Sequence, residues 1–121
     1  MRLIFDTPEN IAVRAAKRYS DLLAAKPNAV LGFAAGSTPL RLYNRLIELY
    51  KQREISFKDA ATFNLDEYAG IDHKHPQSFY RFMMESLFSH IDLDPGRIHM
   101  PSGTDTSDAA LHGYEDAIKN A

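Results

Sequence analysis

Short, mostly apolar runs alternate with longer amphipathic segments along the chain. The apolar runs lie at residues 2–5, 29–35, 60–64 and 97–100. Nearly uninterrupted apolar runs of this length are typical of strands in a parallel sheet, because helices cover both faces of such a sheet. The pattern therefore predicts four strands at these positions.

The segments between and after these runs carry apolar side chains three or four residues apart, which predicts four helices. We expect the helices at residues 8–26, 40–50, 79–87 and 108–120. The side chains expected to face inward from the first and last helices are Ile11, Ala12, Ala15, Tyr19, Leu22, Leu23, Leu111, Tyr114 and Ile118. Strands that alternate with helices pair in parallel through right-handed crossovers, so the predicted fold class is α/β with a mostly parallel sheet.

Two of the helices begin with clear signals. Thr7 and Ser78 stand where a hydroxyl can accept a hydrogen bond from the first helical turn. Pro8 suits the first helical position because no N–H is needed there. Three or four strands make a thin sheet, so we expect the chain to be part of a larger domain.

Composition narrows the possible functions. The 121 residues allow one domain, and 14 basic against 16 acidic residues exclude a general nucleic-acid tail or a polybasic membrane anchor. The absence of cysteine excludes a disulfide scaffold, a thiol nucleophile and a thiolate zinc site. No apolar stretch has the length of a signal peptide or the ~20 residues of a membrane span. We therefore expect the protein in the cytoplasm.

The first candidate site is the turn Gly36, Ser37, Thr38 and Pro39, which follows an apolar strand and begins a helix. Such a turn presents backbone N–H groups at the positive end of the helix dipole, where a phosphate binds well. The two hydroxyls add donors, and the glycine lets the backbone approach a ligand closely. An ordinary strand-to-helix turn with a serine or threonine cap explains the same residues without a ligand.

The second candidate is the adjacent pair Asp66 and Glu67, directly after another predicted strand. The carboxyl ends of parallel strands share one edge of a sheet, so this pair should lie on the same edge as the glycine turn. A carboxylate shielded from water can act as a general base. Adjacent residues of an extended chain point in opposite directions, so one acid should face the site and the other should face away. A solvated acidic loop is the alternative.

The histidines do not suggest a metal site. His73 and His75 stand two residues apart in a polar loop, and nothing nearby supplies further ligands of defined geometry. We interpret this stretch as a mobile loop that could act as a lid.

Three segments together resemble the N-terminal half of the glucosamine-6-phosphate deaminase family, also called glucosamine-6-phosphate isomerases. In chain order they are residues 36–39 (GSTP), 63–68 (FNLDEY) and 75–80 (HPQSFY). Their order and spacing are similar to the family pattern over essentially the whole chain. The turn is also shared with 6-phosphogluconolactonases, whereas the other two segments are more specific. The resemblance implies that residues 1–121 are the N-terminal part of a single sugar-phosphate isomerase/deaminase domain.

The resemblance also implies a Rossmann-like three-layer α/β/α fold and an enzyme that converts glucosamine 6-phosphate and water to fructose 6-phosphate and ammonia. Asp66 would be the base that moves a proton from C2 to C1 through an enolamine, and Gly36, Ser37 and Thr38 would hold the phosphate. Glu67 would be structural or would support the site without touching the sugar, and the loop at residues 68–77 could help to close over the sugar. No cofactor or metal is implied, and the partners would be a small sugar phosphate and, at full length, further copies of the chain.

Two other hypotheses stay open at this point. A related enzyme acting on the galactosamine isomer would carry the same motifs, because nothing in them identifies the pocket wall facing C4. A non-catalytic sugar-phosphate-binding half that pairs with another chain would also need the phosphate turn.

We predict that the 121-residue chain alone has little or no deaminase activity. The resemblance places the groups that open the sugar ring, and the basic residues that complete the phosphate site, after residue 121 of the family pattern. The measurement is ammonia release by the purified chain. Turnover comparable to that of an intact family enzyme would contradict the prediction.

Overall fold

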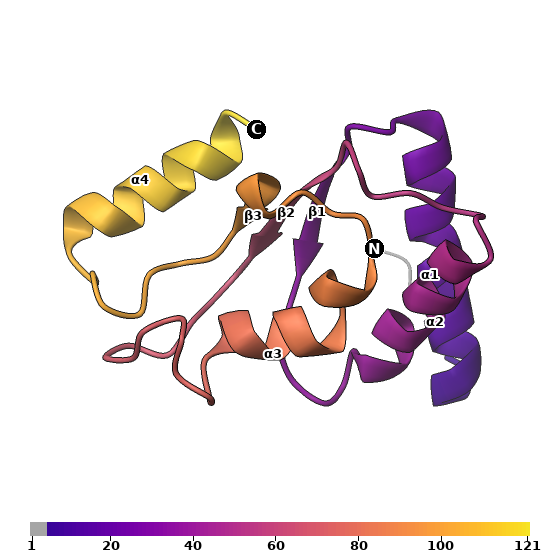
Figure 1. Ribbon diagram of the computed structural model, residues 1–121, viewed down its shortest axis with the longest axis horizontal. Helices are drawn as coiled ribbons and strands as arrows, with labels where there is room; N and C mark the ends of the chain where they lie inside the picture. The colour runs from indigo at the N-terminus through magenta and orange to yellow at the C-terminus, as the bar shows by residue number, and fades with distance from the viewer. Residues whose placement is uncertain (1–4) are drawn as a thin grey trace.

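The computed structural model describes residues 5–121 and contains a three-stranded parallel sheet with α-helices on both of its faces (Figure 1). The strands are β1 (Val30–Phe33), β2 (Ala61–Asn64) and β3 (Ile98–His99), and they lie in the order β1-β2-β3. The predicted α/β class and parallel sheet are confirmed. The strand predicted at residues 2–5 lies outside the described residues, apart from Phe5.

Four helices lie where the apolar spacing predicts them. They are α1 (Pro8–Ala25), α2 (Leu40–Lys51), α3 (Phe79–Ser86) and α4 (Asp108–Lys119), with short 3-10 turns at Phe88–His90 and Pro95–Arg97. The two predicted caps are also confirmed. The Thr7 side chain accepts the Asn10 N–H at 3.2 Å, and the Ser78 side chain accepts the Arg81 N–H at 3.0 Å.

The main core lies on one face of the sheet, beneath α1, α2 and α3. Phe33 on β1 is at its centre: its ring stacks on Tyr19 of α1 at 5.3 Å and meets Tyr43 of α2 and Phe88 edge-on at 5.7 and 5.9 Å. The other buried residues of this cluster are Ala16, Leu23, Ala29, Leu31, Leu46, Leu49, Ile55, Phe57, Ala60, Met83, Leu87 and Leu93. Burial of this apolar surface supplies most of the free energy that holds the three helices on the sheet.

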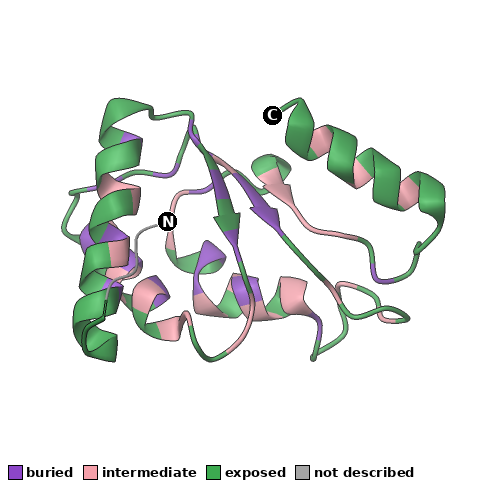
Figure 2. Cartoon of the chain, turned by 180° about the vertical axis from the view of Figure 1, so that it is seen from behind, coloured by how far each residue is buried: buried purple, intermediate pink, exposed green. Residues whose placement is uncertain are grey.

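Helix α4 covers the opposite face, so the structure has the three layers expected of a Rossmann-like fold (Figure 1). Its contact with the sheet is concentrated in Tyr114, whose ring meets Phe63 edge-on at 5.9 Å and whose hydroxyl donates to the carbonyls of Asn64 and His99. No residue of α4 is buried, as the pink and green helix in Figure 2 shows. The attachment of α4 among the described residues therefore depends on hydrogen bonds and one aromatic contact more than on apolar burial.

Part of the predicted inward set is wrong. Leu111 and Ile118 of α4 are 52% and 42% exposed, and Ile11 and Leu22 of α1 are also exposed. The predicted Ala12 and Leu23 are buried, together with Ala16, which was not predicted, in a stripe that faces α2, the main packing partner of α1. Spacing identifies the apolar positions of a helix, but the neighbouring helix decides which of them are covered.

Strand β1 is shorter than the predicted run at residues 29–35. It ends at Phe33 because the next residue, Ala34, bonds to α2 instead of to β2: its N–H donates to the Tyr43 hydroxyl at 3.2 Å, and its carbonyl accepts from the same hydroxyl. The chain thus leaves the sheet immediately before the glycine turn. Within residues 5–121, none of the helices combines the length and apolar character needed to span a membrane.

We predict that Thr62→Val stabilises the protein. Thr62 is fully buried on β2, and its hydroxyl oxygen has no hydrogen-bond partner among residues 5–121. Replacing an unpaired buried hydroxyl by a methyl group of the same shape should raise the free energy of unfolding by about 1 kcal/mol. Urea denaturation measures it.

The control is Thr106→Val, at an exposed position in the loop before α4, where no change is expected. A lower free energy of unfolding in Thr62→Val would show that the hydroxyl does have a partner in solution, such as an internal water.

Candidate functional site

Both candidate segments leave the sheet at the same edge. Strands β1 and β2 are parallel neighbours, and their last residues, Phe33 and Asn64, are paired in the register. Gly36 follows the end of β1 by three residues, and Asp66 follows the end of β2 by two. Ligands of open α/β sheets bind beyond the carboxyl ends of the strands, so this is the edge where a site is expected.

The glycine turn leads into α2 without a side-chain cap. Gly36 has φ +120°, a conformation that only glycine adopts without strain. The N-cap position of α2 is taken by Pro39, and no side-chain oxygen caps the helix. Ser37 and Thr38 are exposed. The hydroxyl cap expected in the ordinary-turn alternative is absent, because neither hydroxyl caps α2, and the choice between an ordinary turn and a phosphate site stays open.

The two adjacent acids have different surroundings. The Glu67 carboxylate accepts the backbone N–H groups of Phe79 at 2.7 Å and Tyr80 at 3.0 Å, at the start of α3. These N–H groups have no partner inside the helix, and a carboxylate there also meets the positive end of the helix dipole. Glu67 therefore has a structural contact with the start of α3, and its role relative to the site stays a prediction.

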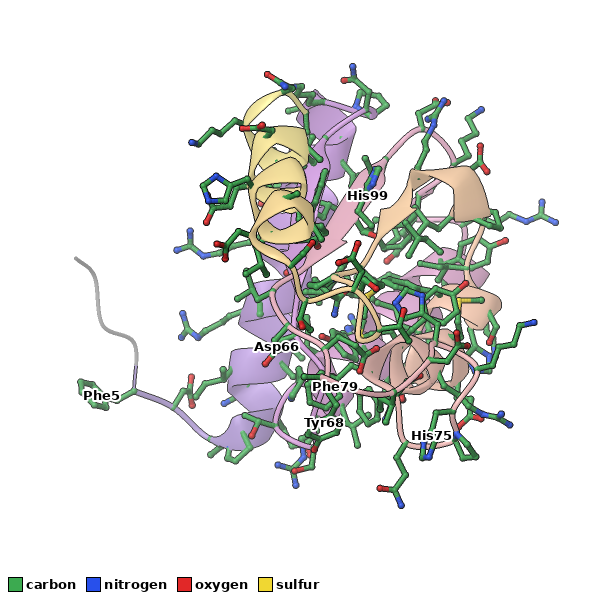
Figure 3. The ribbon with its side chains drawn as sticks, turned by 90° about the vertical axis from the view of Figure 1, so that its left-hand side faces the viewer. Phe5, Asp66, Tyr68, His75, Phe79 and His99 are labelled. Carbon is green, nitrogen blue, oxygen red and sulfur yellow. The ribbon has the colours of Figure 1, made fainter. Side chains whose placement is uncertain are left out.

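Asp66, next to Glu67 in the chain, is exposed. Figure 3 shows it on the side of the molecule that carries Tyr68 and Phe79, whose rings lie 4.5 Å apart between their centroids. Because the Glu67 carboxylate is held against α3 and also accepts the Tyr68 N–H at 2.9 Å, the chain direction just after Asp66 is defined. The described residues do not shield the Asp66 carboxylate from water.

The loop at residues 68–77 contacts the segment at residues 101–103 and helix α3, and its role as a lid stays a prediction. The Gly70 N–H donates to the Gly103 carbonyl at 2.5 Å, and His73 Nε2 lies 3.1 Å from the Pro101 carbonyl oxygen. The His73 ring stacks on Tyr80 at 4.9 Å. A side chain at position 103 would collide with the carbonyl oxygens of this loop, so only glycine allows the approach.

The remaining histidines also have structural contacts or are exposed. His75 Nδ1 accepts the Gln77 N–H at 3.1 Å, and the His99 ring stacks on Phe63 at 4.3 Å. In the part of the chain that the structure describes, no three His, Asp or Glu side chains gather in a way that could hold a metal ion.

Two tyrosine hydroxyls lie at this edge and stay protonated. Burial raises the pKa of Tyr43 to about 12 and the pKa of Tyr114 to about 12, against an ordinary value near 10. Both hydroxyls therefore remain hydrogen-bond donors throughout the neutral range. Sequence reasoning did not assign either tyrosine to the site, because their partners are backbone groups that only the fold brings near.

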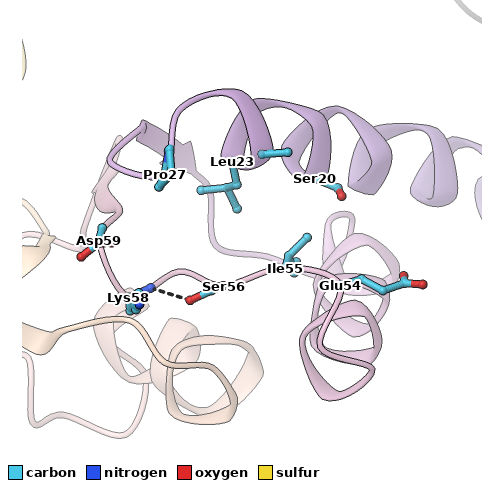
Figure 4. A pocket seen from close by; sticks show the side chains of 9 residues that line it. Ser20, Leu23, Pro27, Glu54, Ile55, Ser56, Lys58 and Asp59 are labelled. Atoms are coloured by element: carbon cyan, nitrogen blue, oxygen red, sulfur yellow. Dashed lines mark hydrogen bonds between the residues drawn. The ribbon is translucent and has the colours of Figure 1, made fainter.

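The cavity of about 310 Å³ in Figure 4 lies elsewhere. It is lined by Leu23 and Pro27 at the end of α1 and by Ile55, Ser56 and Asp59 before β2. These residues precede the strands, so the cavity lies toward the amino ends of the sheet, opposite the two candidate segments. Nothing in its lining adds to the chemistry of the candidate site.

Comparison with known proteins gives a consistent family. Residues 6–121 match the family model described as glucosamine-6-phosphate isomerases/6-phosphogluconolactonase. The chain is 48% identical over 119 residues to a glucosamine-6-phosphate deaminase of Hahella chejuensis, and 46% identical over 120 residues to glucosamine-6-phosphate deaminase 2 of Bacillus subtilis. Both alignments cover 98% of this chain but 46% and 48% of the relatives. The chain thus spans about half the length of the curated relatives it matches.

Solved structures agree with the fold. A structure described as that of a monomeric glucosamine-6-phosphate deaminase superposes with a TM-score of 0.93 at 36% identity, over 99% of this chain and 51% of that one. A 6-phosphogluconolactonase from Thermotoga maritima superposes with a TM-score of 0.74 at 22% identity, over 98% of this chain and 53% of that one. The second similarity concerns the fold alone.

We predict that Glu67→Ala destabilises the protein because it leaves the first N–H groups of α3 without their carboxylate. The free energy of unfolding should fall by about 1–3 kcal/mol, the usual effect of removing a charged acceptor from partly buried donors. The matched control is Glu85→Ala, whose carboxylate forms an exposed ion pair with Arg81 on the same helix. Exposed pairs of this kind contribute about 0–1 kcal/mol.

Urea denaturation of the two variants measures the difference between them. Equal losses of stability in Glu67→Ala and Glu85→Ala would show that the Glu67 cap has no special importance.

Proposed function

The chain belongs to the family of glucosamine-6-phosphate isomerases and 6-phosphogluconolactonases, and from this premise we propose that it acts as a glucosamine-6-phosphate deaminase. The identity to deaminases, 48% and 46%, supports this activity over a lactonase, for which the structural relative is 22% identical. Because the chain spans about half of those relatives, the activity of the whole protein is our proposal.

The observation that carries the proposal is the shared edge of the two candidate segments. The register of β1 with β2 brings the turn of Gly36, Ser37 and Thr38 to the edge that also carries Asp66. A sugar 6-phosphate is an extended molecule with its anion at one end and its reacting carbons at the other. One segment can therefore hold the phosphate while the other meets the carbons.

The phosphate would bind at the start of α2. Backbone N–H groups at a helix start can bind an anion, and the helix dipole favours negative charge there. The exposed hydroxyls of Ser37 and Thr38 add two donors. Binding energy from this remote group fixes the sugar against the base without taking part in the reaction.

The Asp66 carboxylate would then move one proton. It removes the proton from C2 of the open-chain aminosugar, and the C–H electron pair forms the C1–C2 double bond of the enolamine while the C1 carbonyl π bond opens onto its oxygen. When a proton is returned to C1, the nitrogen lone pair forms the C2=N bond and an N–H proton passes to the C1 oxygen, which leaves a C1 hydroxymethyl group and an imine at C2. Addition of water to C2 then releases ammonia and gives fructose 6-phosphate. The bound sugar would displace water from the exposed carboxylate, which strengthens its action as a base. This scheme uses neither a metal nor a cofactor.

Several finer points remain part of the proposal. A galactosamine 6-phosphate enzyme, or a half that binds sugar phosphate without turnover, would use the same turn.

A homo-oligomer was expected from the resemblance, but the solved deaminase at 36% identity is described as monomeric, so the proposal does not depend on assembly. We place the reaction in the cytoplasm, because a doubly charged sugar phosphate does not cross a membrane unaided.

We predict that Asp66→Asn abolishes proton transfer but keeps sugar-phosphate binding. The amide has nearly the same shape as the carboxylate but cannot accept the C2 proton, so the rate at which the C2 hydrogen exchanges with solvent should fall by at least about a hundredfold, in line with the loss of a general base. The measurements are exchange of the C2 hydrogen with solvent and calorimetric binding of fructose 6-phosphate. Both are made on the natural polypeptide that carries this sequence, whatever its length.

The control is Asp59→Asn, which removes an equal charge near the amino end of β2, at the opposite edge of the sheet. It should leave both measurements unchanged. Hydrogen exchange at C2 that survives in Asp66→Asn would remove Asp66 from the role. Binding without any exchange in the unmodified protein would favour the non-catalytic half, and faster turnover of galactosamine 6-phosphate would favour the sister enzyme.

A further inference from the structure

Two tyrosine hydroxyls, one on the buried Tyr43 and one on the half-buried Tyr114, bond to the strand ends that carry the candidate site. Tyr43 comes from α2, on one face of the sheet, and Tyr114 comes from α4, on the other. Each hydroxyl bonds to backbone groups at the carboxyl end of a strand instead of to another side chain. The two contacts lie at the edge from which the glycine turn and Asp66 extend.

Tyr43 fixes the residue from which the phosphate turn begins. Its side chain is 1% exposed, and its hydroxyl both accepts the Ala34 N–H and donates to the Ala34 carbonyl. The backbone groups of Ala34 are thereby satisfied without a neighbouring strand. Gly36 follows two residues later, so the direction in which the turn leaves the sheet is set by this one hydroxyl.

Tyr114 fixes the strand from which Asp66 begins. Its hydroxyl donates to the Asn64 carbonyl, at the last residue of β2, and lies 3.1 Å from the His99 carbonyl at the last residue of β3. One hydroxyl therefore joins the ends of two adjacent strands. Asp66 follows Asn64 by two residues, and on its other side the chain is held by the Glu67 cap of α3.

A third tyrosine offers a natural comparison. The Tyr19 hydroxyl of α1 donates to the Gly32 carbonyl at 2.9 Å, which is also a bond from a helix to a strand carbonyl. Gly32 lies inside β1, before its last residue, and no candidate site residue follows it directly. Loss of this hydroxyl removes a bond of the same kind without touching either strand end.

We propose that Tyr43 and Tyr114 are positioning residues of the site, Tyr43 for the phosphate turn and Tyr114 for the Asp66 carboxylate. The inference rests on the proposed function and adds a division of roles to it. Tyr43 acts on binding of the phosphate, and this binding is equally strong in the ground state and in the transition state. Tyr114 acts on the alignment of the base with C2, which matters in the transition state.

The two variants therefore affect different kinetic constants. Tyr43→Phe should raise KM for glucosamine 6-phosphate about fivefold, the effect of one hydrogen bond, and leave kcat within about twofold. Tyr114→Phe should lower kcat about tenfold or more and leave KM within about twofold, because small misplacements of a reacting group are costly in rate. Tyr19→Phe should change neither constant.

The experiment uses the natural polypeptide with this sequence and measures ammonia release, calorimetric binding of fructose 6-phosphate, and urea unfolding for all three variants. Each variant keeps its aromatic ring, so each should fold and lose a similar, small amount of stability. If the two tyrosines had a purely structural role, the variants would lower only the free energy of unfolding, or would change KM and kcat together. The divided pattern across Tyr43→Phe and Tyr114→Phe is the expected result.

The outcomes separate the two proposals. Turnover by the unmodified protein with no division between Tyr43→Phe and Tyr114→Phe overturns the positioning roles and leaves the deaminase proposal standing. Binding of fructose 6-phosphate without turnover overturns the deaminase proposal and the role of Tyr114. In that case a binding loss in Tyr43→Phe, absent in Tyr19→Phe, still supports the role of Tyr43. Absence of both binding and turnover overturns the deaminase proposal, the phosphate turn and the positioning roles of Tyr43 and Tyr114.

Discussion

The parallel pairing of β1 with β2 is the interaction on which the site depends. Its register sets Phe33 opposite Asn64, so two segments about thirty residues apart in the sequence leave the sheet side by side. In parallel strands, a shift of one residue would reverse the faces on which side chains lie. Phe33 would then leave the core that it centres between α1, α2 and Phe88. The same apolar packing that stabilises the fold therefore also brings the anion turn beside the carboxylate.

The edge itself is organised by the need to satisfy backbone groups. A strand end and a helix start both leave N–H and carbonyl groups without partners of their own. At this edge, Tyr43 satisfies Ala34, Tyr114 satisfies Asn64, and Glu67 satisfies the first N–H groups of α3. Each of these contacts also fixes the direction of a segment that carries a candidate site residue. Preorganisation of the site is thus a consequence of ordinary hydrogen-bond satisfaction.

The sequence predicts local features well because their partners are near in the chain. The caps Thr7 and Ser78 act on N–H groups three residues away, and the helices follow from apolar spacing. Long-range contacts are different. Glu67 reaches Phe79 across twelve residues, and Tyr114 reaches Asn64 across fifty. No local pattern distinguishes these side chains from exposed ones. For the same reason, apolar spacing predicted that Leu111 faces inward but could not show that this side of α4 stays exposed.

The contrast between Asp66 and Glu67 shows what the structure adds to a motif. The two acids are chemically alike and adjacent, and only their surroundings separate them. A carboxylate that accepts two backbone N–H groups of a helix start is held in place and has these lone pairs occupied, which suits a fixed support. A carboxylate beside it that remains exposed keeps its lone pairs available for a substrate. The same argument applies to the turn, where the hydroxyls of Ser37 and Thr38 do not cap α2 and are open to a ligand. Side chains that the fold already uses give the site its shape, and those it leaves available are the ones that can meet a sugar phosphate.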